Sequence, residues 1–214
     1  MRISPNNKIP AIVDPNTGDL SVFESGAILT YLAQHYRLRS SEQLLPSAES
    51  DPRGNATVLQ WLNWQMGGFG PMLGQYNRKH AHTPTPPFLC DYTHASADFY
   101  NYAPEKIEYA IARYRNEAKR LFDVLDKQLA ANEYVAGAHY SIADIAIWPW
   151  AIMIPRFGEE FASAYPHVTA WVERLKRRSA VNKVWIKVSE TVSKPPAPFT
   201  DEQKKILFGI EAKK

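Results

Sequence analysis

Two short apolar segments near the start of the chain are separated by a run of turn-forming residues. Residues 9–13 are apolar and rich in β-branched side chains, and residues 20–23, LSVF, alternate as a strand does. The stretch DPNTGD between them, residues 14–19, is dense in residues that favour turns. This pattern predicts a β-hairpin.

The spacing of the apolar positions changes at residue 24. Beyond it the apolar residues recur at helical spacing, namely Ala27, Ile28, Tyr31, Leu32 and Tyr36. A helix is therefore predicted to start near Ser25. Residues 39–55 are polar and contain two prolines and a glycine, which is typical of a linker that leads to a second domain.

The rest of the chain is predicted to be helical, with helices over residues 51–66, 104–131, 141–154, 166–178 and 201–210. The longest is amphipathic, whereas the helix over 141–154 is nearly all apolar and is expected to be buried on all sides. The apolar face of the longest helix consists of Ile107, Ala110, Ile111, Tyr114, Ala118, Leu121, Leu125 and Leu129. We therefore predict an α+β, mainly α protein. It has a small α/β part at 1–38, a linker at 39–50, a helical domain at 51–187 and a tail at 188–214.

Composition excludes several classes of protein. Of the 214 residues 45% are hydrophobic, which is enough to bury a core, and the net charge is only +3. Basic and acidic residues are interspersed, so no nucleic-acid partner is expected, and the basic run RLKRR at 174–178 is interpreted as the solvated last turn of a helix. A single cysteine allows no intrachain disulfide. The sequence has no apolar window of about 18 residues and no N-terminal signal pattern, which predicts a cytoplasmic protein without membrane contact.

The motif IPA at residues 9–11 heads the first predicted strand. Proline cannot donate to a strand ladder, so Pro10 belongs at a strand start or edge. A cis Ile9–Pro10 bond would present the backbone N–H and C=O of Ile9 outward, where a peptide-like ligand could pair with them. An ordinary trans proline at a strand edge explains the same residues.

The motif FESGA at residues 23–27 lies where the strand gives way to the helix. Free N–H groups at a helix start suit a carboxylate, the Ser25 hydroxyl adds a donor, and Glu24 could hold an ammonium group. Together they would suit the α-amino acid end of a ligand. The alternative is that Ser25 is a plain helix N-cap.

The motif SIAD at residues 141–144 opens the most hydrophobic helix. Ser141 followed three residues later by Asp144 is a capping-box arrangement, so this pair is predicted to be structural. The tryptophans at helical spacing are likewise predicted to pack in the core; they are Trp61, Trp64, Trp148, Trp150 and Trp171.

These three motifs, in this order and spacing, closely resemble the soluble glutathione transferase superfamily. Longer strings resemble its nu class of bacterial glutathione-dependent disulfide oxidoreductases and the fungal proteins related to a prion-forming nitrogen-catabolite regulator. The strings are NNKIPAIVD, VFESGAILTYLA, GGFGPMLGQ, YAPEKIEYAIARY and YSIADIAIWPW. The resemblance covers nearly the whole chain. It implies a thioredoxin-like N-terminal domain followed by a helical domain.

The resemblance also implies roles for the motif residues. Pro10 would follow a cis bond, and the Ile9 backbone would pair with the cysteinyl unit of glutathione. Glu24 and Ser25 would hold the amine and the carboxylate of its γ-glutamyl end.

Two further residues and the partners come from the same resemblance. Arg113 matches an arginine near the sulfur end of the ligand, close to a dimer interface. Lys8 could reach the glycine carboxylate, or it is simply solvated. The implied substrates are glutathione and a small electrophile or disulfide, with a homodimer as the assembly, a role in detoxification and no metal.

The chain departs from the family at its start. The family places a strand, a helix and another strand before the IPA strand, and this segment carries the residue that contacts the glutathione sulfur. Here only seven residues precede Lys8, so no catalytic residue is predicted. Two hypotheses follow: an enzyme that conjugates glutathione or reduces disulfides in its full-length form, or a non-catalytic dimerising or binding module.

The second departure is an apparent insertion at residues 76–101. It contains His80, His82, Cys90 and His94, but their spacing matches no standard metal site and the context is rich in proline. We interpret the insertion as a loop that shapes the electrophile pocket or the dimer contact, without metal and without a catalytic thiol.

Overall fold

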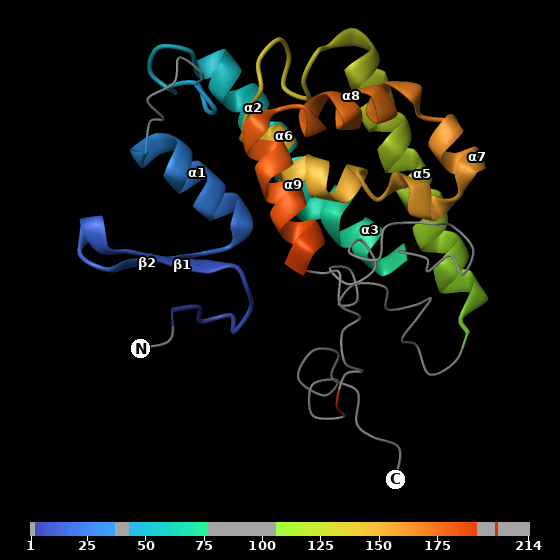
Figure 1. Ribbon diagram of the computed structural model, residues 1–214, viewed down its shortest axis with the longest axis horizontal. Helices are drawn as coiled ribbons and strands as arrows, with labels where there is room; N and C mark the ends of the chain where they lie inside the picture. The colour runs from blue at the N-terminus through green and yellow to red at the C-terminus, as the bar shows by residue number, and fades with distance from the viewer. Residues whose placement is uncertain (1–2, 37–42, 77–105, 192–199, 201–214) are drawn as a thin grey trace.

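The computed structural model describes residues 3–36, 43–76, 106–191 and 200. Its N-terminal part contains the predicted hairpin (Figure 1). Strand β1 (Ala11–Asp14) pairs antiparallel with β2 (Leu20–Phe23), from Ala11 opposite Phe23 to Asp14 opposite Leu20. A short 3₁₀ helix, η1 (Pro15–Thr17), forms the connection and ends at Gly18, whose φ of 69° suits glycine. The hairpin prediction is confirmed.

Helix α1 (Ser25–His35) follows β2 directly, as predicted, and is tied to the hairpin by one carboxylate. Asp14 is buried and accepts hydrogen bonds from the hydroxyls of Tyr31 and Tyr36, each at 2.5 Å. The Tyr31 hydroxyl, followed by that of Tyr36, lowers the pKa of Asp14 below its ordinary value. The end of β1 is thus fastened to α1 at Tyr31 and to the residue that follows α1, Tyr36.

The helical domain contains more elements than the sequence pattern predicts. They are α2 (Pro52–Trp64), the π-helix η2 (Gln65–Phe69), α3 (Gly70–Tyr76), α5 (Glu108–Ala131), α6 (Ile142–Ala151), the 3₁₀ helix η4 (Ile154–Phe157), α7 (Glu159–Ser163), α8 (Pro166–Lys176) and α9 (Ser179–Thr191). The predictions missed α3, α7 and α9, and the helix predicted over 51–66 changes to π geometry at Gln65. The short helix predicted over 201–210 lies outside the described residues.

The core lies between the helices of this domain. Phe69 of η2, Phe122 of α5 and Trp171 of α8 are each at most 1% exposed. Of the five tryptophans predicted as core, Trp171 is fully buried, while the other four are half-buried and pack against the core. Helix α6 is not buried on all sides, because Pro149 is exposed.

The predicted capping box at the start of α6 is present. Asp144 is fully buried and accepts from the Ser141 backbone N–H at 3.0 Å and from the Ser141 hydroxyl at 3.1 Å. Its other oxygen accepts from the Val135 N–H at 3.0 Å and the Trp171 indole N–H at 3.1 Å. The capping box is thus formed, and both carboxylate oxygens of Asp144 are hydrogen-bonded.

The basic run ends α8 as predicted, but its side chains are not simply solvated. The Arg174 guanidinium lies 5.5 Å from the centre of the Tyr134 ring and donates to the Glu133 carbonyl. The Arg178 guanidinium lies 3.9 Å from the centre of the Tyr140 ring. The run is thus the end of a helix as predicted, and two of its cations also cover aromatic rings.

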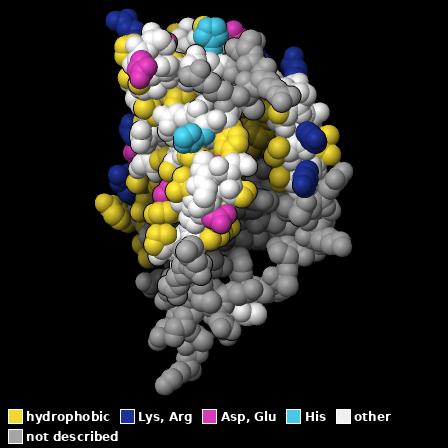
Figure 2. Space-filling model, turned by 90° about the vertical axis from the view of Figure 1, so that its left-hand side faces the viewer, with side chains coloured by type: hydrophobic (Ala, Val, Ile, Leu, Met, Phe, Trp, Pro, Cys, Tyr) yellow, Lys and Arg dark blue, Asp and Glu magenta, His cyan; other side chains and the backbone are white. Residues whose placement is uncertain are grey.

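The face of the molecule that carries the hairpin and α1 has hydrophobic side chains scattered among polar ones (Figure 2). Val13, Leu20 and Leu32 are between 39% and 44% exposed. Within the described residues, no helix combines the length and the apolar character needed to cross a membrane.

Candidate functional site

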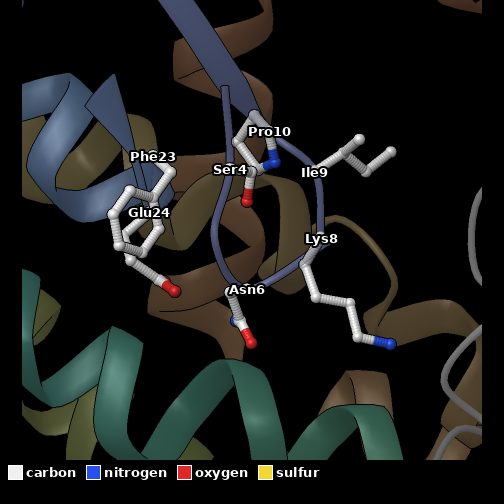
Figure 3. Close-up of a pocket in the computed structure, with 7 residues that line it drawn as sticks. All are labelled: Ser4, Asn6, Lys8, Ile9, Pro10, Phe23 and Glu24. Atoms are coloured by element: carbon white, nitrogen blue, oxygen red, sulfur yellow. The ribbon is translucent and has the colours of Figure 1, made fainter. Parts of the chain in front are cut away.

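A pocket of about 300 Å³ opens between the chain before β1 and the junction of β2 with α1 (Figure 3). This volume is at the lower end of the range of small-ligand sites, ~300–1,000 Å³. Its lining residues are Ser4, Asn6, Lys8, Ile9, Pro10, Phe23 and Glu24. Four of the six residues predicted to bind glutathione thus line one pocket.

The segment before β1 folds into a loop that forms one wall of the pocket. The Asn7 N–H donates to the Ser4 carbonyl at 3.1 Å, and Asn7 itself has a φ of 54°. The Ile9–Pro10 bond is cis, so the trans alternative for Pro10 is wrong. The Ile9 side chain is 96% exposed and points away from the pocket, which leaves the Ile9 main chain to face a ligand (Figure 3).

Glu24 forms the opposite wall at the junction of strand and helix. Its φ of 69° and ψ of 121° are unusual for a residue other than glycine, and such conformations cluster at functional sites. Glu24 is the N-cap of α1, yet its side chain makes no capping hydrogen bond. The carboxylate of Glu24 and the N-terminal end of α1 therefore lie together beside the pocket.

Ser25 is the first residue of α1, so the interpretation of Ser25 as the N-cap is wrong. Its hydroxyl donates to the Met66 sulfur of η2 at 3.5 Å. Ser25 is half-buried and is not among the residues that line the pocket, although it is next to Glu24.

Arg113 is not brought to the pocket. It lies on α5, where its side chain is 55% exposed and its guanidinium is 3.7 Å from the Glu117 carboxylate. The Glu117 carboxylate also binds Arg120 at 2.6 Å, and Arg120 is the main reason that the pKa of Glu117 is lowered.

Sequence reasoning missed three lining residues, Ser4, Asn6 and Phe23. Ser4 is the most informative, because it is only 9% exposed and its hydroxyl has no hydrogen-bond partner among the described residues. The run SPNN marks a turn, but no local pattern shows that the turn buries a hydroxyl in the wall of a pocket.

The chemistry of this pocket suits the main chain and charged end of a peptide. It offers the main chain of Ile9 just before the start of β1, a carboxylate at Glu24 and a buried hydroxyl at Ser4, and the N-terminus of α1 begins next to it at Ser25. A strand start pairs with peptide groups, a carboxylate binds an ammonium group, and a helix N-terminus favours a carboxylate. Among the residues that the structure describes, no cluster of His, Cys, Asp and Glu has the arrangement of a metal site.

Comparison with known proteins agrees with this chemistry. Residues 1–34 match the family model of the glutathione S-transferase N-terminal domain, and residues 82–179 match that of the C-terminal domain. The disulfide-bond oxidoreductase YfcG of Escherichia coli is 44% identical over 191 residues, which cover 87% of this chain and 75% of YfcG. The chain belongs to the glutathione S-transferase family.

Other members of this family extend the comparison. The disulfide-bond oxidoreductase YghU of Escherichia coli is 40% identical, and the match covers 86% of this chain but only 56% of YghU. The glutathione transferase YghU of Streptococcus pneumoniae, solved with glutathione, has a TM-score of 0.65 at 35% identity and covers 92% of this chain and 65% of that one. The glutathione transferase URE2P6 of Phanerochaete chrysosporium, solved with oxidised glutathione, has a TM-score of 0.73 at 32% identity. The match covers 90% of this chain and 77% of URE2P6.

These findings confirm the predicted fold class, a thioredoxin-like N-terminal part followed by the helical domain of a glutathione S-transferase. The division at 1–38, 39–50, 51–187 and 188–214 stays a prediction, as does the expectation of a strand, a helix and another strand before the IPA strand. Nearly all of the predicted loop at 76–101, with its three histidines and Cys90, lies outside the described residues.

Proposed function

We propose that this chain binds glutathione in the pocket between the loop before β1 and the start of α1, and that it uses glutathione to reduce disulfide bonds. The observation that carries the proposal is the joining of Lys8, Ile9, Pro10 and Glu24 in one pocket. The disulfide chemistry is supported by the similarity to two relatives from Escherichia coli, the disulfide-bond oxidoreductases YfcG and YghU.

The residues of the pocket would divide the ligand between them. The Ile9 main chain would pair with the cysteinyl unit, and Glu24 would bind the γ-glutamyl amine. Ser25 and the N-terminal end of α1 would bind the γ-glutamyl carboxylate, and Lys8 the glycine carboxylate. The Ser4 hydroxyl is buried without a partner, so an acceptor on the ligand would satisfy it.

The sulfur chemistry would come from glutathione, because none of the described lining residues carries a thiol. The thiolate of one glutathione would attack a substrate disulfide and release one substrate thiolate, which takes up a proton. A second glutathione thiolate would attack the glutathione sulfur of the mixed disulfide, giving oxidised glutathione and the second reduced thiol. The protein would hold the peptide and orient its sulfur.

A binding module without turnover is the second candidate. It is favoured by the side chains that line the pocket, which in the described part of the chain include no histidine to take the proton of the glutathione thiol. Conjugation to an electrophile belongs to the first candidate as an alternative use of the same thiolate. For either candidate we propose that the protein is cytoplasmic and forms a homodimer with Arg113 near its interface. Light scattering on the purified chain would test the dimer.

The decisive test is calorimetric titration with glutathione, followed by a reductase-coupled assay with hydroxyethyl disulfide. Glu24→Ala removes the carboxylate that faces the ligand amine, so glutathione affinity should fall about 10-fold or more, as expected for a charged hydrogen bond of ~1.5–3 kcal/mol. Glu160→Ala removes an exposed carboxylate of α7 and is the matched control.

Each outcome separates the candidates. Binding with turnover supports the reductase, and binding without turnover supports the binding module. An unaltered chain that does not bind glutathione, or a Glu24→Ala variant that binds as well as the control, would contradict the proposed site.

A further inference from the structure

The Ser25 hydroxyl is held by a residue from the helical domain. It donates to the Met66 sulfur at 3.5 Å, across 41 residues of sequence, in a partly buried position. A thioether is a weak acceptor, and a carboxylate is a much stronger one. The hydroxyl is therefore occupied, but only by a partner that a ligand carboxylate can displace.

Gly26 makes this contact possible. A Cβ atom at residue 26 would lie 3.1 Å from Met66 Cγ and 3.4 Å from its sulfur, which is too close unless Met66 moves. With glycine at this position, the first turn of α1 approaches Met66 without displacing its side chain. The close approach of α1 to Met66 thus involves both Ser25 and Gly26.

The π-helix η2 presents Met66 to α1. Gln65 and Phe69 of η2 are directed into the core, being 4% and 0% exposed, while Met66 is half-buried at the contact with the helix N-terminus. A π turn inserts one extra residue, which changes the direction of the side chains on either side of it, and such turns are frequent at functional sites. The altered geometry directs Met66 toward the pocket end of α1.

We propose that Met66 is a positioning residue that controls the Ser25 hydroxyl in the glutathione site, an inference that rests on the proposed function. Without a ligand, Met66 holds the hydroxyl. When glutathione enters, its γ-glutamyl carboxylate takes the hydroxyl over, and the Met66 sulfur loses its donor. Part of the binding free energy of that carboxylate is used to break the contact with Met66.

Replacing the sulfur tests this exchange. Met66→Leu keeps an apolar side chain of similar volume but removes the acceptor, so the affinity for glutathione should rise about two- to five-fold, as expected for loss of a weak competing hydrogen bond. γ-Aminobutyryl-cysteinyl-glycine differs from glutathione only in lacking the α-carboxylate. Met66→Leu should therefore leave the affinity for this analogue unchanged. Met72→Leu, a half-buried methionine of α3, is the matched control and should change neither affinity.

A double-mutant cycle separates positioning from packing. In the Ser25→Ala background there is no hydroxyl to compete for, so Met66→Leu should no longer alter glutathione affinity. A purely structural role of Met66 would give the same change with both ligands and in both backgrounds, and that result would overturn the inference.

A measurement on the unaltered chain gives a second readout. With ¹³C-labelled methionine methyl groups, glutathione should shift the Met66 resonance and leave the Met72 resonance in place. The analogue without the carboxylate should leave the Met66 resonance in place as well. A static Met66 resonance with glutathione bound would overturn the inference and leave the proposed function intact. Failure of the unaltered chain to bind glutathione would overturn both.

Discussion

In the described residues, the hairpin with α1 contains the buried Asp14 and the helical domain contains the buried Asp144, and the two carboxylates are stabilised in different ways. Asp144 is 0% exposed inside the helical domain and is bound by three N–H groups and one hydroxyl. Asp14 is 5% exposed at the end of β1 and is bound by two tyrosine hydroxyls and the Asn16 N–H.

The pKa values of these carboxylates move in opposite directions. Burial raises the pKa of Asp144 despite its hydrogen bonds, whereas the hydroxyls of Tyr31 and Tyr36 outweigh burial and lower the pKa of Asp14. The difference follows from the surroundings. Among the described residues 3–36 only Ser4, Asp14 and Ile28 are buried, while the helical domain encloses Asp144 in a large apolar core.

The comparison shows how the two parts hold together. The helical domain is stabilised by apolar packing, and both oxygens of its buried Asp144 carboxylate are hydrogen-bonded. The hairpin and α1 depend on a polar cluster at Asp14 and on the docking of Leu29 and Ala33 of α1 against apolar residues of α2 and α6. The pocket therefore lies in the part of the described chain with the smaller core, where the main chain stays accessible to a ligand.

The largest expected effect is on the helical domain. Asp144→Ala leaves the N–H groups of Val135, Ser141 and Trp171 buried without partners, so the free energy of unfolding should fall by about 3 kcal/mol. Chemical denaturation measures this loss. Asp144→Asn is the control, since it keeps one acceptor and should lose less; an unchanged midpoint for Asp144→Ala would contradict the role of this carboxylate.

A smaller and more local effect is expected at the hairpin. Asp14→Asn weakens the bonds to Tyr31 and Tyr36, so amide hydrogen exchange in β1 and β2 should accelerate while α6 stays protected. Equal acceleration in α6 would show that the hairpin and the helical domain open together, and the comparison between them would fail.

The pH dependence should have opposite signs at the two aspartates. The lowered pKa of Asp14 gives a stabilisation that is present above its ordinary value of 3.8 and is lost as pH falls through the folded pKa. The raised pKa of Asp144 gives a contribution that is present below 3.8 and is lost as pH rises through the folded pKa. Chemical denaturation of Asp14→Asn and Asp144→Asn over about pH 2.5 to 7, a range that includes the ordinary pKa of aspartate, tests this. The slope of the unfolding free energy against pH should change in opposite senses in the two variants.

The smallest effect is expected where the basic run covers aromatic rings. Arg178→Ala removes a guanidinium 3.9 Å from the centre of the Tyr140 ring and should cost about 0.5–1 kcal/mol of unfolding free energy. Arg177→Ala, at the exposed neighbouring position, is the matched control. Thermal melting of the two variants compares them directly, and equal midpoints would restore the interpretation of this run as merely solvated.

Local patterns predicted the features that depend on neighbouring residues. The hairpin, the start of α1 and the capping box of Ser141 with Asp144 follow from turn residues, periodicity and capping, which act over a few positions. The cis bond after Ile9 and the membership of the glutathione transferase family were predicted from the resemblance of the motifs. The short helices α3 and α7 were missed because five to seven residues carry too weak a periodic pattern to detect.

The sequence by itself determined the hairpin, the start of α1, the long helix α5 and the capping box of Ser141 with Asp144, and it carries the IPA and FES motifs on which the family resemblance rests. Only the tertiary structure decided which side chains surround the pocket. It buried the Ser4 hydroxyl there, kept Arg113 on the exposed side of α5 and joined Ser25 to Met66 through the close approach at Gly26. The physical reason is that these contacts join residues distant in sequence, whose meeting depends on how α1 docks against the π-helix and on no pattern within either segment.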